Sequence, residues 1–327
     1  MLHKKSKTIA AFAVVLIGLI SFIVIACNVG SLKVSAVELF RGLFIEYDET
    51  VHTIYDLRFP RIFVAMLAGA ALSVSGVLFQ AVLRNPLADP TIIGVSSGAS
   101  FVAVIMTACL PQMIFMVPLY AFIGGLASFA LVFSLSYKGG LRPIRIILVG
   151  VAVSAVFNGL ISGVSSIGGT TSSAANIVDA NITMKTWSDV KLLSGYVLVG
   201  LVLAFASWYF CNLLALEDKT ARSLGVNVTV VRIIVSLIAV LLASISTAVV
   251  GVISFVGLIV PHIARLIIGA NHKVLLPFSA ALGALLLVVA DTIGRTIFAP
   301  FEISAAIIMS VLGGPLFIVL LRKNKQI

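Results

Sequence analysis

The chain has 327 residues, of which 61% are apolar and 10% charged, and its mean hydropathy is +1.20. Soluble domains have about 45–50% apolar and about 25% charged residues, so this excess of apolar side chains must face lipid. Composition excludes a soluble enzyme, a disordered chain and a secreted disulfide scaffold. The net charge is +10, and the charged residues lie between apolar runs, where basic residues orient a protein in the membrane. We therefore expect a polytopic membrane protein with membrane lipid, and no nucleic acid, as a partner.

Ten apolar runs divide the chain, and about 20 such residues cross a bilayer as a helix. We expect an all-α fold with about ten transmembrane helices, at 9–29, 62–83, 92–109, 114–136, 146–165, 192–213, 233–251, 254–268, 274–292 and 303–321. Three connections stand out: a long polar loop at 30–61, a Ser-, Thr-, Gly- and Asn-rich stretch at 166–191, and a charged segment at 214–232.

The first apolar run could be a signal peptide or a membrane span. It follows Lys4, Lys5 and Lys7 and ends at Cys27, a pattern that a lipoprotein signal peptide also has. Because more membrane helix follows instead of a soluble domain, we interpret the run as a retained first span.

Charge bias supports ten spans with both termini in the cytoplasm. With that topology most Lys and Arg residues fall in cytoplasmic segments and most acids fall outside, as the positive-inside rule requires. Adding or removing one span would break this alternation from that point onward. We therefore expect a multi-pass protein of the bacterial cytoplasmic membrane.

An internal repeat is the next feature. The segment RIFVAMLAGAALSVSG from Arg61 and the segment RIIVSLIAVLLASIST from Arg232 coincide at Arg, Ile, Val, Ala and two Ser, without gaps. Their starts are five spans apart, and an odd number gives opposite orientations in the membrane. The pattern predicts an inverted five-plus-five repeat within a single transmembrane permease domain, 1–327, with approximate halves 1–191 and 192–327.

The chemistry of the spans limits how transport can be energised. The span interiors hold almost no ionisable group, which argues against a proton-driven carrier. The chain has no G-x-x-x-x-G-K-[ST] phosphate loop, so we expect no catalytic residue, no bound cofactor and no metal, with ATP used by a partner subunit. The sequence then predicts a docking site for that ATPase.

The candidate is LLALEDKTARSLG, ending at Gly225, which predicts a short cytoplasmic helix with a glycine stop. A helix lying on lipid headgroups is the alternative. The mixed-charge face fits a basic membrane-surface helix poorly and favours a protein. The residues expected to couple to the ATPase are Leu216, Ala221, Arg222, Leu224 and Gly225.

Several segments resemble the iron-siderophore, haem and vitamin B12 permeases of ABC importers. They are LRFPRIFVAMLAGAALSVSGVLFQAVLRNPLADPTIIGVSSGA (57–99), LALEDKTARSLG (214–225), GVISFVGLIVPHIARLIIG (251–269) and the Gly313-Gly314-Pro315 ending. The resemblance implies ten helices per subunit, a second permease subunit (a copy or a close paralogue), two cytoplasmic ATP-binding subunits and an extracytoplasmic substrate-binding protein. One departure is local: Glu217-Asp218 stands where the family commonly has Gly-Glu, so this chain lacks the family's glycine at the start of the docking helix.

Three arginines are expected at the outer face: Arg58 and Arg61, which flank Pro60, and Arg295. Snorkelling at the membrane interface is the alternative reading. Against it, outer arginines run contrary to the orientation bias. In the family, arginines at these motif positions receive acidic residues of the binding protein, and bidentate pairing explains Arg in place of Lys.

The pathway residues are expected on the fifth span. Asn158, Gly159 and Gly163 are small or weakly polar, and Gly159 and Gly163 form a Gly-x-x-x-Gly that most often marks a close helix contact. In the family this helix lines the pathway, so these residues are also candidates for setting pore width.

The sequence thus predicts the pore subunit of an ATP-driven importer for an iron chelate, either haem or an Fe(III)-siderophore. A cobalamin importer permease is the alternative, and an ion-coupled secondary carrier competes from a different class. The stretch Thr183–Val190 most resembles haem-iron permeases of Gram-positive bacteria, while composition and spacing separate none of these ligands.

Overall fold

The computed structural model describes residues 2–28, 34–136, 143–168, 177–178, 180, 182–299 and 301–323, and every regular element in these ranges is a helix. The elements are α1 (Leu2–Asn28), α2 (Ala36–Phe44), α3 (Glu49–Leu57), α4 (Phe59–Leu83), α5 (Val95–Cys109), the 3-10 helix η1 (Pro111–Met116), α6 (Val117–Ser136), α7 (Pro143–Gly168), α9 (Trp187–Ala206), α10 (Trp208–Leu214), α11 (Asp218–Ser223), α12 (Val228–Val250), α13 (Val256–Ile268), α14 (His272–Thr296) and α15 (Ala305–Lys323).

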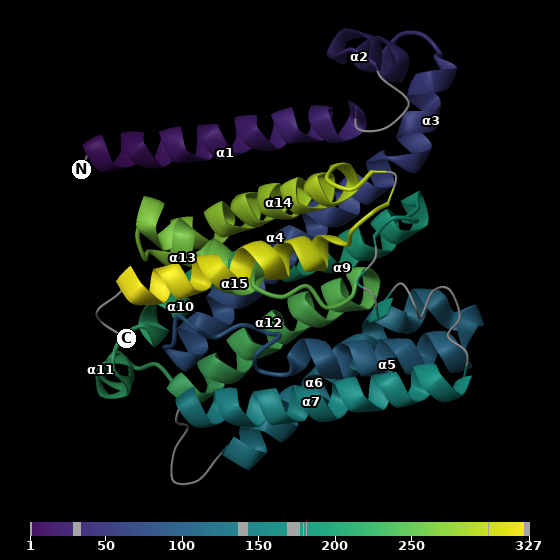
Figure 1. The fold of residues 1–327 in the computed structure, drawn as a ribbon. Coiled ribbons are helices and arrows are strands. Elements are labelled where there is room, and N and C mark those ends of the chain that lie inside the picture. The colour runs from purple at the N-terminus through teal and green to yellow at the C-terminus, as the bar shows by residue number, and fades with distance from the viewer. Residues whose placement is uncertain are drawn as a thin grey trace.

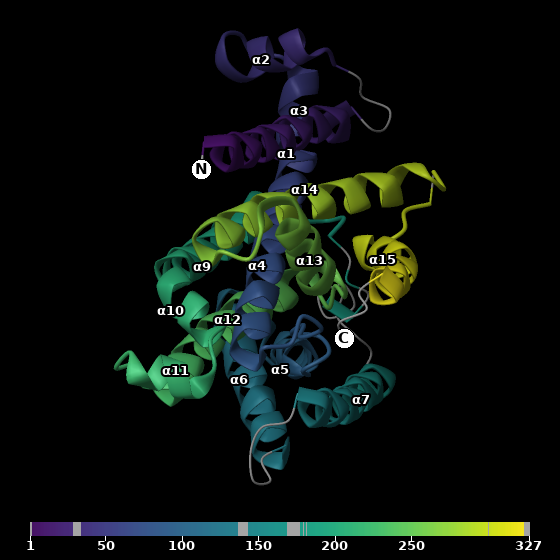
Figure 2. The same ribbon diagram turned by 90° about the vertical axis from the view of Figure 1, so that its left-hand side faces the viewer.

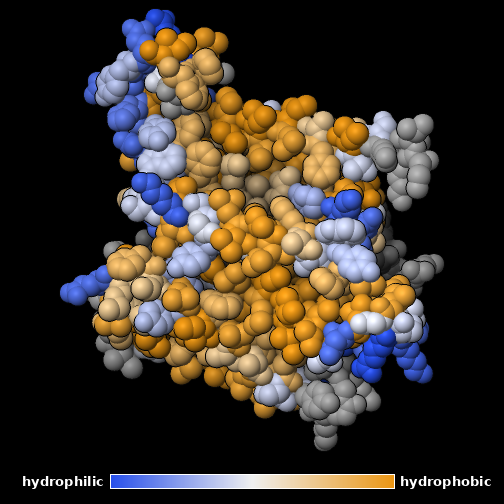
Figure 3. Space-filling model, turned by 180° about the vertical axis from the view of Figure 1, so that it is seen from behind, coloured by the Kyte–Doolittle hydropathy of each residue, from blue (hydrophilic) through white to orange (hydrophobic). Residues whose placement is uncertain are grey.

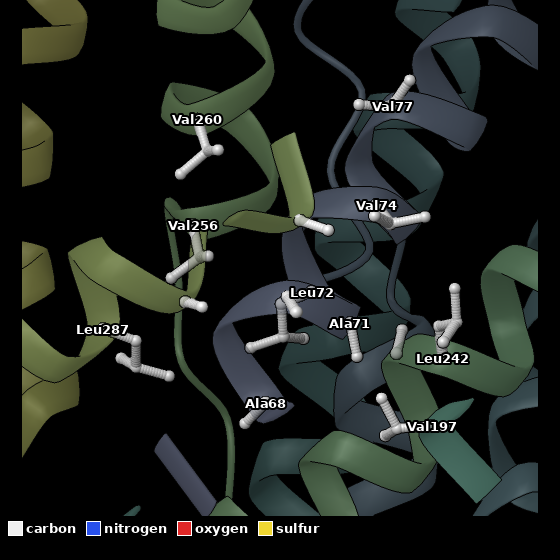
Figure 4. Close-up of a cluster of buried hydrophobic side chains, with 14 of the residues drawn as sticks. Ala68, Ala71, Leu72, Val74, Val77, Val197, Leu242, Val256, Val260 and Leu287 are labelled. Carbon is white, nitrogen blue, oxygen red and sulfur yellow. The ribbon is translucent and has the colours of Figure 1, made fainter. Parts of the chain in front are cut away.

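Helix α4 is the centre of the bundle. It packs against α9, α12, α13 and α14, and Figure 2 shows it surrounded by them. Figure 4 shows its apolar side chains facing Val256, Val260 and Leu287 in one direction and Val197 and Leu242 in the other. Both predicted halves therefore contribute to one core.

Small residues allow this close packing. A Cβ added to Gly76 would lie 1.9 Å from the Gly257 carbonyl oxygen, and one on Gly69 would lie 2.3 Å from that of Gly283. The hydroxyls of Ser73 and Ser75 donate hydrogen bonds to backbone carbonyls of α14 and α12, each at 2.7 Å. Without a hydrophobic driving force in lipid, such backbone approach and interhelical hydrogen bonds hold membrane helices together.

The outer helices are apolar and exposed, as a lipid-facing surface requires. Helix α1 exposes Ile9, Val14, Ile17 and Ile20, each by more than 60%, and large apolar side chains of α7 and α9 are also exposed. Figure 3 shows apolar side chains covering most of the face seen from behind. This excess of apolar residues at the surface is what the composition predicted.

Each of the ten predicted spans has an apolar helix at its position, the sixth being broken at Ser207 into α9 and α10. Seven candidate spans are long and apolar enough to cross a membrane. The helices at Val95–Cys109, Val256–Ile268 and Ala305–Val319 are shorter. The structure thus supports a multi-pass protein, and the count of ten stays a prediction.

The directions of the helices agree with an inverted repeat. In Figure 1, α4 and α12 run in opposite directions, and the described ends of α1 and α15 nearest the termini lie at the same end of the bundle as α11. The Ser73/Ser244 and Ser75/Ser246 pairs are all buried. Opposed direction is necessary for the repeat, which itself stays a prediction.

The predicted polar loop at 30–61 is wrong as a description of its described part, which forms α2 and α3. Ser35 and Glu38 make a reciprocal capping box at the start of α2, and Asp48 accepts the Val51 amide at the start of α3. Such caps satisfy amides that the first helical turn leaves unbonded. In the 166–191 connection, residues 169–176, 179 and 181 lie outside the described residues.

Candidate docking and coupling sites

A network of buried charges lies at the end of the bundle opposite α11. Pro60 occupies the first turn of α4, as predicted, and Arg61 next to it is 4% exposed. The Arg61 guanidinium donates to both oxygens of Asp291 on α14 at 2.8–3.1 Å. Its Nη1 lies 2.8 Å from Glu302 Oε2 in the α14–α15 connection.

Arg295 and Arg58 complete this network. Arg295 is one helical turn after Asp291, with Nε 3.4 Å from Asp291 Oδ2 and Nη2 3.4 Å from the Ala26 carbonyl oxygen. Arg58 is half-buried, and its guanidinium donates to the Cys27 carbonyl. Two arginines, Arg61 and Arg295, are thus balanced by two carboxylates of the same chain.

This arrangement differs from the expectation of three arginines displayed for a partner. Arg61 and Arg295 are buried and paired within the chain. The exposed member of the network is Glu302, whose side chain is 39% exposed and also accepts the Thr183 hydroxyl. Partial burial works to raise the pKa of Glu302, yet the hydrogen bond and charge of Arg61 hold it below its ordinary value.

The charged segment at the other end forms a short helix, as predicted. Helix α11 ends in a Schellman motif: the Val226 amide donates to the Ala221 carbonyl and the Gly225 amide to the Arg222 carbonyl. Gly225 has φ +80°, which confirms the predicted left-handed stop. Glu217, at the departure from the family pattern, precedes the helix as its N-cap without a side-chain hydrogen bond.

A three-residue clamp holds α11 in place. Asp218 lies 2.6 Å from Arg84 at the end of α4 and 2.9 Å from Arg232 in the first turns of α12. Arg84 also donates to the Leu214 and Leu216 carbonyls. Burial works to raise the pKa of Asp218, but Arg232 and Arg84 hold it below its ordinary value. Sequence analysis did not identify this clamp. The signal that could have found it is the internal repeat, in which Arg232 aligns with Arg61.

The predicted coupling residues separate into two groups. Leu216, Arg222, Leu224 and Gly225 are exposed, with Leu224 60% exposed. Ala221 is 1% exposed and packs inward against the chain's own core, so the structure does not present it to a partner. The physical reason is that Ala221 lies on the face of α11 that the clamp draws against the bundle.

The predicted pathway residues all lie on an open face of α7. Asn158, Gly159 and Gly163 are exposed, and a Cβ added to either glycine would meet nothing within 4 Å. The glycine pair therefore makes no close helix contact within this chain. Figure 2 shows α7 at the edge of the bundle, far from α1 and α14.

Two acids near the ends of the expected spans are buried. Asp291 and Asp89 are each 1% exposed. Asp291 is paired with Arg61, while Asp89, in the turn between α4 and α5, accepts the amide and hydroxyl of Thr91. Burial raises the pKa of Asp89, opposed by these hydrogen bonds. Within the described ranges no three His, Cys, Asp or Glu side chains gather in a way that could hold a metal ion.

Exposed apolar helices long enough to cross a bilayer identify a multi-pass membrane protein, with a charge network at one end and a clamped helix at the other. The chain belongs to the FecCD transport family, whose sequence model matches residues 14–323. It is a permease component of the ABC importer class.

Among curated proteins, the chain is 41% identical over 322 residues to the "Probable heme-iron transport system permease protein IsdF" of Staphylococcus aureus strains bovine RF122 / ET3-1 and Newman, covering 98% of each sequence. Among solved structures, it matches a metal-chelate-type ABC transporter in an inward-facing conformation with TM-score 0.81 and 28% identity, covering 97% of this chain and 99% of that one. PsaBC from Streptococcus pneumoniae in complex with Fab shares the fold, with TM-score 0.61 and 19% identity.

Proposed function

We propose that this chain is the pore subunit of an ATP-driven importer for an iron chelate, with haem the first candidate and an Fe(III)-siderophore the second. The observation that carries the proposal is the 41% identity to the staphylococcal haem-iron permease over 98% of both sequences. The identity with this relative extends over the whole chain. It therefore covers the spans that would contact the substrate as well as the motifs that the family shares.

The complete transporter contains a second permease subunit, either a copy of this chain or a close paralogue. The open face of α7 supports this proposal, because Asn158 is exposed there and a Cβ added to Gly159 or Gly163 would meet nothing within 4 Å. A second copy placed against α7 leaves a route lined by small side chains between the subunits.

Two ATP-binding subunits dock on the cytoplasmic side, at α11, and an extracytoplasmic binding protein docks at the opposite end. ATP is used by the partner subunits, and both termini of this chain are cytoplasmic. The shared location of α11 and the described ends of α1 and α15 supports that orientation (Figure 1). The positive-inside bias of the sequence points the same way.

The binding protein delivers its carboxylates to the rim formed by Arg58, Arg61 and Arg295. Arg61 becomes available when an incoming carboxylate replaces Glu302, the one half-exposed acid of the described network. Asp291 stays paired with Arg61 during the exchange, because Arg61 donates to Asp291 through Nε and Nη2 and to Glu302 through Nη1.

The decisive experiment is transport by the complete complex. The permease is reconstituted in vesicles with its ATPase and binding protein, and ATP-dependent uptake of haem, an Fe(III)-siderophore and cobalamin is compared. Uptake of haem supports the proposal. Uptake of cobalamin alone would assign the alternative substrate, and uptake driven by an ion gradient without ATP would make the chain a secondary carrier.

A further inference from the structure

The helices α2 and α3 form an arm that stands apart from the bundle. Figures 1 and 2 both place α2 beyond α1, on the side of the molecule opposite α7. The arm is a defined structure: Gly42 on α2 lies against Val51 on α3, where an added Cβ would come within 2.6 Å of the valine side chain. The caps at Ser35 and Asp48 fix the start of each helix.

Helix α2 has three distinct faces. Leu39 is buried and Gly42 faces α3, which together make the packing face. Val37, Phe40 and Phe44 follow the i, i+3, i+7 spacing of one helical stripe, and they are exposed by 76%, 59% and 73%. Ile45 and Tyr47 extend this apolar surface beyond the helix, exposed by 71% and 75%.

The third face is polar. It carries Glu38 and Arg41, both exposed, and Arg41 pairs at 2.6 Å with Glu46 in the turn after the helix. Figure 3 shows hydrophilic side chains gathered along the far edge of the arm, with apolar side chains on its other edge. An apolar stripe beside a polar one, in a helix outside the bundle, is the pattern of a helix that lies in a membrane interface.

An aromatic groove lies between the arm and the body. It has a volume of about 440 Å³ and is lined mainly by Phe44, Tyr55, Phe59, Phe63 and Trp187. The Tyr55 and Trp187 rings lie 4.7 Å apart and the Phe63 and Trp187 rings 5.7 Å apart. Tyrosine and tryptophan are enriched at the level of lipid headgroups, where one end of the ring is apolar and the other is wet.

We propose that the arm is an anchor at the outer surface of the cytoplasmic membrane, with phospholipid as its partner. Helix α2 lays Val37, Phe40 and Phe44 into the outer leaflet. An acyl chain occupies the aromatic groove. The arm lies beyond α1, a helix whose large apolar side chains are exposed, and this position argues for lipid. The arm lies on the side opposite α7, which separates it from the proposed subunit interface. The assignment to the outer leaflet rests on the orientation given under the proposed function.

Site-directed nitroxide labels test the position of α2. Cys109 is the exposed cysteine and is replaced by Ser, which leaves the buried Cys27 and Cys211. Labels are then placed by Phe40→Cys and Phe44→Cys on the apolar stripe, and by Arg41→Cys and Glu46→Cys on the polar side. The permease alone is reconstituted in vesicles of phosphatidylethanolamine and phosphatidylglycerol, and collisions with oxygen and with a water-soluble nickel chelate are measured.

The proposal predicts that labels at Phe40 and Phe44 collide mainly with oxygen, which concentrates in the bilayer, while labels at Arg41 and Glu46 collide mainly with the chelate. Equal chelate access at all four positions would overturn the proposal and place the arm in water. Loss of both collisions at Phe40 and Phe44 would also overturn it, because protein would then cover the stripe.

The groove has its own test, which needs no change in the arm. The chain has two tryptophans, so Trp208→Phe leaves Trp187 as the sole indole. Phospholipids brominated on the acyl chain should quench Trp187 emission, more strongly for bromine near the headgroup than near the chain end. Absence of quenching would show that no acyl chain occupies the groove and would overturn this part of the proposal. Neither test requires transport, so failure of the proposed function would leave these results standing.

Discussion

The guanidinium of Arg61 on α4 and the carboxylate of Asp291 on α14 form a bidentate pair between residues 230 positions apart in the chain. Both side chains are buried, with 5% and 2% exposure. A buried pair of this kind contributes little net stability compared with apolar residues of the same size, but removing one partner leaves an uncompensated charge. The pair therefore ties α4 to α14 at the end of the bundle opposite α11.

Truncating Arg61 should destabilise the chain strongly. Arg61→Leu leaves Asp291 with only the weaker contact to Arg295, and we expect a loss of about 3–5 kcal/mol in unfolding free energy. The double variant Arg61→Leu with Asp291→Leu should recover most of it. Thermal unfolding in detergent measures both, with Glu302→Gln as a control that shifts the midpoint little because that carboxylate is half-exposed. Equal stability of the single and double variants would argue against the pairing.

Exchange at Arg61 gives a prediction about docking. Arg58→Glu, at the half-buried arginine of the rim that does not pair with Asp291, should weaken capture of the binding protein, and changing the partner's matching acid to Lys should restore it. Glu302→Gln should strengthen capture, because the competing internal carboxylate is gone. Surface-immobilised complexes measure these affinities. Unchanged binding in single variants of Arg58, Arg61 and Arg295 would assign all three to structural roles.

The open face of α7 should control uptake without affecting folding. Gly159→Trp and Gly163→Trp have space for the new side chain within this chain, so we expect normal thermal stability and binding-protein capture but reduced substrate uptake. Gly195→Trp on α9 is the matched control, since an added Cβ there also meets nothing within 4 Å. Normal uptake with tryptophan at both α7 positions would mean that this helix does not line the route.

The end of α11 should control energy coupling. A β-branched residue at Gly225 penalises the left-handed conformation by roughly 1–2 kcal/mol, which shifts the segment that follows. Gly225→Val and Leu224→Asp should both abolish substrate-stimulated ATP hydrolysis while sparing membrane insertion and outer docking. Stimulation that survives both changes would place the coupling element elsewhere.

The Asp218 clamp predicts a pH dependence with a defined sign. Because the pKa of Asp218 is lower in the folded state, its ion pairs stabilise the fold above the unfolded value and this contribution disappears as pH falls through the folded pKa. Asp218→Asn should cost about 1 kcal/mol or less near pH 7, given that the carboxylate is partly exposed. The thermal unfolding midpoints of the Asp218→Asn variant and the unsubstituted protein should converge as the pH falls from about 5 to about 3, a range that crosses the ordinary aspartate pKa. A difference that stays constant over this range would contradict an ionic clamp.

Composition and local pattern were sufficient for the class of protein and the positions of its long apolar helices, though not for α2 and α3. An apolar run long enough to span lipid forms a helix wherever it occurs, since no water is present to satisfy its backbone. The stop at Gly225 is equally local, because the left-handed position needs a glycine and its hydrogen bonds reach only to residues in the last turn of α11. Motifs in order along the chain were enough for the family.

The tertiary structure alone decided which of the singled-out side chains can meet a partner. Arg61 and Arg295 are surface arginines by sequence position, yet Arg61 is paired with Asp291 and Glu302, which lie 230 and 241 positions further along the chain. The helix packing that brings Asp291 to Arg61 also buries Arg295, one turn after Asp291. Ala221 faces inward and the α7 glycines face outward, although nothing in their local sequence distinguishes the two cases. Burial and charge pairing depend on which helices pack together. Packing is set by long-range contacts that local propensity does not encode, whereas helix formation is set within a few turns.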